Sequence, residues 1–335
     1  MSYTPPSDAA PAPPAPLDWP TDPQAQWKLA AATGRSPHPV RAIQIETTSI
    51  CNFRCPSCPL AMGDYDRPEE HLSLEKFERM LDAYPDIEKV ELQGIGEIYL
   101  NPCILDIIRA AKARGVEVHT FSNASRIDRK AAYGTVEAGL DVINFSLDGA
   151  DEPTFRRARK GGTLERYRRC VTNLREAREA LGSTTPRMGA MVVLSKKNVD
   201  QIPQLLAIAE ELGMDSIIFT KMNAAANPEL TPELLGGEER RWIESLPPYR
   251  GKLDVVWAYT PWTKQERMEC YWPQMMSYLT VDGDVTPCCN YYDGRELSFG
   301  NVFEQDGATI WNNEAYAAFR KQLWSGDLPD KCKTC

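Results

Sequence analysis

The sequence predicts an α/β fold, a partial (β/α)6 barrel of the TIM type followed by a small cysteine-rich domain. Three observations lead to this prediction. Short apolar segments alternate with helical segments from residue 40 to about residue 225. The alternation then stops, and residues 270–335 contain five of the ten cysteines. A repeated strand-then-helix unit builds a parallel sheet, whose ligands lie at the carboxyl ends of the strands.

Residues 1–39 are rich in Pro and Ala and predict a flexible N-terminal arm. Residues 40–225 form the predicted barrel, with strands at 42–47, 89–94, 117–122, 141–147, 188–195 and 215–220 and helices at 74–83, 104–113, 129–138, 164–181 and 199–212. Pro-rich residues 226–269 predict an irregular linker. Residues 270–335 form the second domain, where Asp282 and Gly283 predict the turn of a β-hairpin.

The composition excludes several classes of protein. The chain has 335 residues and a formal net charge of −9, which argues against broad contact with nucleic acid. Nothing in it resembles a membrane-spanning run. The N-terminus lacks the basic-then-apolar pattern of a signal peptide, so we expect a cytoplasmic protein without a disulfide framework. A local basic run at Arg156, Arg157, Arg159 and Lys160 reads as a solvated helix end.

Three cysteines directly follow the first predicted strand. Cys51, Cys55 and Cys58 have the spacing C-x3-C-x2-C. Three thiolates can hold a four-iron cluster and leave one iron open to a cofactor. A zinc site is the alternative that this spacing alone leaves open.

Residues at the ends of the next strands extend this motif. Gly94-Ile95-Gly96-Glu97, Ser122-Asn123 and Ser146-Leu147-Asp148-Gly149 end the second, third and fourth strands. Together with the three cysteines, they resemble the radical S-adenosylmethionine (SAM) enzymes. The resemblance implies that SAM binds the open iron and that further residues contact SAM. Gly96 and Glu97 would contact its amino group, and Arg159 its carboxylate. The ribose would be contacted by Ser122, Asn123 and Ser146, and the adenine by Leu194.

The C-terminal cysteines have their own pattern. Cys270, Cys288, Cys332 and Cys335 are separated by 17, 43 and 2 residues. With Gly283-Asp-Val-Thr-Pro-Cys288 and Gly300-Asn301-Val302, they resemble the auxiliary-cluster domain called SPASM in its shortened "twitch" form. The resemblance implies a second [4Fe–4S] cluster held by four thiolates, and a structural zinc is the alternative.

The resemblance also implies a reaction. An external donor such as flavodoxin or ferredoxin reduces the first cluster, SAM is cleaved, and a 5′-deoxyadenosyl radical abstracts a substrate hydrogen. The auxiliary cluster then accepts an electron, which oxidises a secondary alcohol in a small polar substrate. This outcome is similar to that of the twitch dehydrogenases of aminocyclitol antibiotic pathways.

Other outcomes stay open at this point. An epimerase would return hydrogen from a thiol, for which Cys103 and Cys289 are the candidates. Many SPASM enzymes instead modify a ribosomally made peptide. A zinc-stabilised interaction protein and an RNA-modifying enzyme are further alternatives. Three residues are expected near the barrel mouth, where they would contact the substrate: Tyr99, Lys221 and Asn223.

Overall fold

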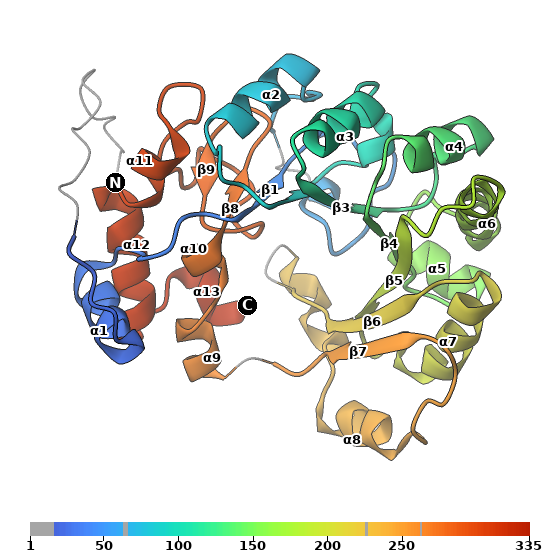
Figure 1. The fold of residues 1–335 in the computed structure, drawn as a ribbon. Helices are drawn as coiled ribbons and strands as arrows, with labels where there is room; N and C mark the ends of the chain where they lie inside the picture. Colours follow the sequence, from blue (N-terminus) through green and yellow to red (C-terminus); the bar gives the residue numbers. More distant parts are fainter. Residues whose placement is uncertain (1–16, 63–65, 225–226, 262) are drawn as a thin grey trace.

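The computed structural model describes residues 17–62, 66–224, 227–261 and 263–335 (Figure 1). Its centre is a curved sheet with the order β7-β6-β5-β4-β3-β2-β1-β8-β9. All neighbouring strands are parallel except β8 and β9. The strands are β1 Ala42–Ile45, β2 Lys89–Leu92, β3 Glu117–Ser122, β4 Val142–Ser146, β5 Arg187–Leu194, β6 Ser216–Lys221, β7 Asp254–Ala258, β8 Met276–Leu279 and β9 Val285–Thr286.

Helices cover the outside of this sheet (Figure 1). Ser73 and Thr163 begin two of them, because each hydroxyl accepts a hydrogen bond from the backbone of the first turn. The helices are α1 Pro23–Thr33, α2 Leu74–Asp82, α3 Ile104–Ala113, α4 Arg129–Glu137, α5 Glu152–Ala158, α6 Leu164–Ala180, α7 Ile202–Glu211, α8 Gly237–Ser245, α9 Lys264–Met268, α10 Trp272–Met275, α11 Gly307–Trp311, α12 Glu314–Ser325 and α13 Asp330–Thr334. The 3-10 helices are η1 Pro59–Ala61, η2 Ile98–Leu100, η3 Val199–Gln201 and η4 Pro228–Glu233.

The predicted partial barrel is confirmed, and so are its six strands to within two residues. The alternation of side chains fixes which of them face inward. Phe145 packs its ring against Tyr167 of α6, with centroids 6.4 Å apart, so Ser146 faces the barrel interior. Ser146 pairs with Met191 of β5. Met191 therefore faces inward as well, whereas Leu194 faces the helices.

The prediction of an irregular linker at 226–269 is wrong. This segment contains η4, α8, β7 and α9, and β7 extends the sheet beyond β6. The short strand β7 is an edge strand whose side chains are mostly exposed, so it lacks the buried alternation by which a strand is recognised in a sequence.

The C-terminal part of the chain joins the barrel sheet. The predicted hairpin is present as β8 and β9, and Gly283 in its turn has a φ of +90°, which favours glycine. Strand β8 also pairs in parallel with β1, so the second domain continues the sheet of the first.

The predicted N-terminal arm is ordered in its second half. Helix α1 packs against α12, where the rings of Trp27 and Trp324 lie 5.2 Å apart (Figure 1). The first 16 residues of the predicted arm lie outside the described residues. Among the helices that are described, none has the length and apolar character needed to cross a membrane.

Candidate functional site

The loop that carries Cys51, Cys55 and Cys58 follows β1 and lies at the carboxyl end of the sheet. Its backbone is tied to the segment after α5, because the Arg54 N–H donates to the Lys160 carbonyl at 2.8 Å. The guanidinium of Arg54 folds back onto the loop and donates to the Cys51 carbonyl at 2.7 Å. These contacts fix the loop without using the sulfur atoms.

The three thiols of this loop lie close enough together to interact electrostatically, and none forms a disulfide. Burial raises the pKa of Cys51 to about 11 and also raises the pKa of Cys58. Two polar groups point at the sulfurs: the Asn123 amide lies 3.9 Å from the Cys51 Sγ, and the Arg159 guanidinium lies 4.0 Å from the Cys55 Sγ. Donors of this kind stabilise thiolates and adjust the potential of an iron–sulfur cluster.

Glu97 joins the ends of β2 and β3. Its buried carboxylate accepts hydrogen bonds from the Ser122 hydroxyl at 2.8 Å, the Asn123 N–H at 2.7 Å and the Tyr99 N–H at 3.2 Å. Burial raises the pKa of Glu97. A carboxylate has about four acceptor positions, so one is left for an ammonium group, which would also offset the cost of burial. Glu97, predicted to contact the SAM amino group, is thus brought together with Ser122 and Asn123, two of the residues predicted to contact the ribose.

Gly96 brings this segment against the cysteine loop. Its N–H donates to the Thr48 carbonyl at 3.1 Å. A Cβ at this position would lie 2.4 Å from the Thr48 oxygen and 2.5 Å from the Ile50 oxygen. Only glycine allows so close an approach of the two backbones.

Arg159 lies beside the cysteine loop, as expected from the sequence, and is oriented by Asp148. The Arg159 Nε lies 2.5 Å from the Asp148 carboxylate, and both side chains are largely buried. Burial by itself would lower the pKa of Arg159, but the Asp148 carboxylate and the Cys55 sulfur together raise it above its usual value. Arg159 therefore remains a cation next to Cys55.

Two predicted contacts point elsewhere. Leu194 is fully buried against the outer helices, so its neighbours Val193 and Ser195 line the small cavity beside the cysteine loop instead. Leu194 therefore lies on the outer face of β5, and the prediction that it contacts the adenine assigned it to the wrong face. Tyr99 donates to or accepts from the Thr135 hydroxyl of α4 at 3.0 Å, so its phenol faces the helix layer and not the barrel mouth. Ser146 faces the barrel interior, as expected.

The C-terminal thiols form a second group. Its members lie close enough together to interact electrostatically: Cys270, Cys288, Cys332 and Cys335. The Cys335 sulfur also accepts a hydrogen bond from the Asn290 amide at 3.4 Å. Burial raises the pKa of Cys270 to about 11 and that of Cys332 to about 12. The structure thus brings together four thiols that the sequence spaces over 66 residues.

A cavity of about 380 Å³ lies between the two groups of thiols. Ser57 and Ile95 line it from the barrel, Asn223 lines it after β6, and Cys289 and Asn290 line it from the C-terminal domain. Charged side chains complete its wall: Asp66, Asp293, Arg295, Glu296 and Lys331.

The remaining candidates differ in their relation to this cavity. Asn223 lines it, as predicted. Lys221 ends β6 near Cys335, and burial lowers its pKa. Cys103 begins α3 and packs against the core, and it lines none of the described cavities. Of the two spare thiols, only Cys289 faces the cavity.

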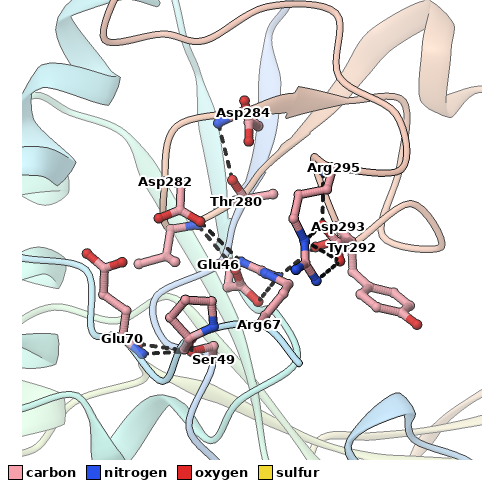
Figure 2. Close-up of polar contacts among 12 residues, drawn as sticks. Glu46, Ser49, Arg67, Glu70, Thr280, Asp282, Asp284, Tyr292, Asp293 and Arg295 are labelled. Carbon is pink, nitrogen blue, oxygen red and sulfur yellow. Dashed lines mark hydrogen bonds and ion pairs between the residues drawn. The ribbon is translucent and has the colours of Figure 1, made fainter. Parts of the chain in front are cut away.

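A buried ion pair beside the cavity was not predicted (Figure 2). Glu46 directly follows β1, and its carboxylate accepts two hydrogen bonds from Arg67, at 2.6 and 3.2 Å. It also accepts a hydrogen bond from the Val281 N–H at 3.2 Å, and Arg67 donates to the Tyr292 carbonyl at 2.7 Å. The pair therefore links the end of β1 to the turn after β8 and to the segment of Tyr292, which lines the cavity. In the sequence, this ion pair is indicated only by Glu46, a charged residue at the end of an apolar strand.

The donor sets agree with two iron–sulfur clusters. Seven thiols without disulfide partners lie in one group of three and one of four, and the group of three adjoins the Glu97 and Arg159 side chains. Within the described ranges, no three His, Cys, Asp or Glu side chains are arranged to hold a single metal ion.

Two family models match the chain. The radical SAM superfamily model matches residues 45–209, and the SPASM model, an iron–sulfur cluster-binding domain, matches residues 270–335. This pair of domains implies SAM and two [4Fe–4S] clusters as cofactors.

Curated relatives span most of the chain. The tungsten-containing aldehyde ferredoxin oxidoreductase cofactor-modifying protein of Pyrococcus furiosus is 27% identical over 84% of this chain and 83% of its own length. The PqqA peptide cyclase of Streptomyces rochei is 24% identical over 87% of this chain and 80% of its length. The GTP 3′,8-cyclase of Chlorobaculum tepidum is 26% identical over 81% of this chain and 85% of its length.

Solved structures share the fold. Streptococcus suis SuiB bound to the precursor peptide SuiA has a TM-score of 0.67 and 15% identity, over 89% of this chain and 70% of SuiB. BtrN in complex with AdoMet and 2-DOIA has a TM-score of 0.52 and 17% identity, over 89% of this chain and 93% of BtrN. These structures agree with the fold, and the two matched models, over residues 45–209 and 270–335, show that the chain belongs to the radical SAM superfamily and carries a SPASM iron–sulfur domain.

Proposed function

We propose that this radical SAM enzyme oxidatively modifies a peptide in the cavity between the barrel and the SPASM domain. The lining of that cavity carries the proposal. Ser57 and Ile95 come from the barrel loops next to the first group of thiols, and Cys289 and Asn290 directly follow Cys288 of the second group. A substrate seated there lies between the group that starts the radical reaction and the group that can accept an electron.

The ligands belong to the same proposal. Cys51, Cys55 and Cys58 hold the first cluster, and Cys270, Cys288, Cys332 and Cys335 hold the auxiliary cluster, as in the twitch form. When bound, the first cluster and SAM supply a 5′-deoxyadenosyl radical that removes a hydrogen atom from the substrate. A reduced flavodoxin or ferredoxin is the external donor, and the proposed location is the cytoplasm.

The chain's own residues orient the reactants. Gly96 and Glu97 accept the SAM amino group, Arg159 faces its carboxylate, and Ser122 and Asn123 keep the Glu97 carboxylate in place. The largely buried Asp148 fixes Arg159. Holding reactants in one geometry in this way is a large part of what an enzyme contributes to rate.

The relatives favour a peptide as the substrate. PqqA peptide cyclases recur among the curated relatives. SuiB was solved with a precursor peptide. The structure of anSMEcpe, whose TM-score to this chain is 0.59, also contains a bound peptide. The cavity wall offers both acids and bases, including Asp293 and Lys331, for the polar groups of a peptide.

A second candidate is oxidation of a secondary alcohol in an aminocyclitol-like molecule. The observation in its favour is the second group of thiols, whose four members would leave no iron of the auxiliary cluster open. Such a cluster is suited to electron transfer. BtrN, which was solved with 2-DOIA, shares the fold.

One experiment separates these candidates. The reconstituted protein is incubated anaerobically with SAM, dithionite and either a set of candidate peptides or a set of aminocyclitols, and the products are analysed by mass spectrometry. We expect 5′-deoxyadenosine together with a peptide that has lost two mass units. The same loss on an aminocyclitol alone would replace the peptide proposal with the second candidate.

Epimerisation gives a different signature. The substrate mass would stay unchanged in H2O, and deuterium would enter from D2O. In that case Cys289→Ala should abolish deuterium incorporation and Cys103→Ala should not, because only Cys289 faces the cavity. Absence of 5′-deoxyadenosine with every substrate would contradict the proposed function as a whole.

A further inference from the structure

We propose that strand β7 docks an extended segment of the peptide substrate, which pairs with it as an added strand of the sheet. The inference rests on the proposed function and deepens it, because it names how the peptide is held away from the reacting atoms. Strand β7, Asp254–Ala258, forms one end of the sheet, and β6 is its one neighbour among the described strands (Figure 1). Its other edge is therefore open to pairing with a further strand.

The backbone of β7 points alternate residues at this free edge. The Asp254 N–H donates to the Asp215 carbonyl at 3.0 Å, so Asp254 faces β6. Because successive residues of a strand direct their N–H and C=O groups to opposite sides, Val255 and Trp257 direct theirs away from β6. In the part of the chain that the structure describes, no hydrogen bond from another segment reaches the backbone of either residue. An extended peptide presents backbone groups at the same spacing and would satisfy all four.

This edge lacks the features that usually keep an exposed strand apart from other chains. Residues 255–263 contain no charged side chain, and the register of β7 with β6 has no bulge. The apolar side chains of Val256 and Trp257 are 41% and 43% exposed. The Trp257 ring is held in position by Phe219 of β6, on which it stacks with the two centroids 4.6 Å apart. An uncharged, apolar edge with a fixed aromatic ring is suited to binding a peptide through both its backbone and its side chains.

The free edge is continuous with the cavity in which the substrate is proposed to react. Thr220 of β6 pairs with Ala258, so the two strands end together, and Asn223 just after β6 lines the cavity. Val256 belongs to a row of paired residues that faces the barrel interior: Ser146, Met191, Ile218 and Val256. A strand added beside β7 therefore directs every second side chain into the barrel, and its backbone leads to the cavity.

The test removes one outward N–H group. In Val255→Pro, the nitrogen that faces the free edge loses its hydrogen, whereas the Asp254 N–H that faces β6 is kept. Proline is tolerated at such a position of an edge strand. Val255→Thr is the matched control, because it changes the same side chain and keeps the N–H. The probe is a pool of synthetic twelve-residue peptides of random sequence, in which mass spectrometry identifies a member that loses two mass units with SAM and dithionite.

The KM and kcat for that peptide are compared in wild type and the two variants. We expect Val255→Pro to raise KM about tenfold and to leave kcat within about twofold of wild type, because the lost hydrogen bond holds the peptide and does not contact the reacting atoms. Val255→Thr should match wild type in both constants. Iron content and thermal unfolding show that each variant is folded.

A second measurement needs no protein variant. The same peptide is N-methylated on either its odd-numbered or its even-numbered residues outside the modified position, and the wild-type KM is measured for both forms. A peptide paired with β7 directs only alternate N–H groups at the strand. One methylated form should therefore raise KM about tenfold, and the other should stay within about threefold of the parent peptide.

The outcomes separate the two proposals. A modified peptide whose KM is equal in Val255→Pro and wild type, or whose two methylated forms lose binding equally, would overturn the docking edge and leave the proposed function in place. If no peptide of the pool is modified, the proposed function fails and the docking edge fails with it. If Val255→Pro converts a dimer into a monomer in sedimentation and leaves KM unchanged, β7 pairs with a second copy of the chain and not with the peptide.

Discussion

The carboxylate of Glu46 and the guanidinium of Arg67 form a buried ion pair, with side chains that are 0% and 4% exposed (Figure 2). The pair joins β1 to the Val281 N–H and to the Tyr292 carbonyl of the SPASM domain. It thus connects the strand that leads into the cysteine loop with the wall of the cavity.

Removing one partner of this pair should be costly. Arg67→Met leaves a buried carboxylate without its cation, and we expect a loss of about 3–5 kcal/mol in the free energy of unfolding. Urea unfolding of the cluster-free protein, followed by circular dichroism, measures this loss. The Glu46→Leu/Arg67→Met double variant is the control and should recover much of the stability, because it leaves no buried charge unpaired; Asp282, whose carboxylate lies 3.7 Å from Arg67, is half-exposed. A single variant as stable as wild type would show that the pair does not hold the domains together.

Cys55→Ala should remove the first cluster only. We expect about eight irons per chain in the reconstituted wild type and about four in the variant, because each cluster contains four. SAM cleavage should be abolished and the far-ultraviolet spectrum retained. Cys170→Ala is the matched control, because Cys170 is buried in the core on α6 and its loss should leave the iron content unchanged. SAM cleavage by Cys55→Ala at the wild-type rate would contradict the assignment.

Cys332→Ala should separate SAM cleavage from product formation. The first group of thiols is untouched, so 5′-deoxyadenosine should still form with dithionite. The oxidised product should be lost, because the substrate radical has no electron acceptor. Iron analysis and mass spectrometry of one reaction mixture check both statements. If the product still forms at the wild-type rate, the auxiliary cluster is not the acceptor.

Gly96→Ala should impair SAM binding more than folding. Its Cβ would clash with two carbonyl oxygens of the segment that leads into the cysteine loop and push that segment away from Glu97. We expect at least a tenfold rise in the Kd for SAM, measured by calorimetry on the reconstituted protein. Gly237→Ala on α8 is the control, because its Cβ would meet only the flexible end of Arg241 at 3.3 Å. Equal SAM affinity in both variants would show that the close approach at Gly96 is not needed.

The local features of the chain were predictable. The strands β1 to β6 carry apolar runs, and the three cysteines of the first loop lie within eight residues, so both are visible in a sequence. Glu97, Ser122 and Asn123 were placed correctly because strand ends of a parallel sheet meet at one edge.

The tertiary features were not predictable in the same way. The pairing of β8 with β1 joins residues 276–279 to residues 42–45, and no local pattern encodes it. Arg67 lies 21 positions after Glu46 in the sequence, and its charge looks like that of any surface arginine. Leu194 was misplaced because apolar side chains lie on both faces of a buried strand, so only its neighbours across the sheet show which face is inward.

The pairing of β1 with β8 also has a consequence for how the protein is made. The strand that leads into the cysteine loop gains its second neighbour only after residues 276–279 have left the ribosome. Contacts between such distant parts of a chain form late and slow folding. The edge of β1 therefore stays exposed during most of synthesis, and the strand before the cysteine loop gains its contacts with β8 only when the SPASM domain has folded. A released protein without its last domain should therefore load its one remaining site less completely than the full chain does.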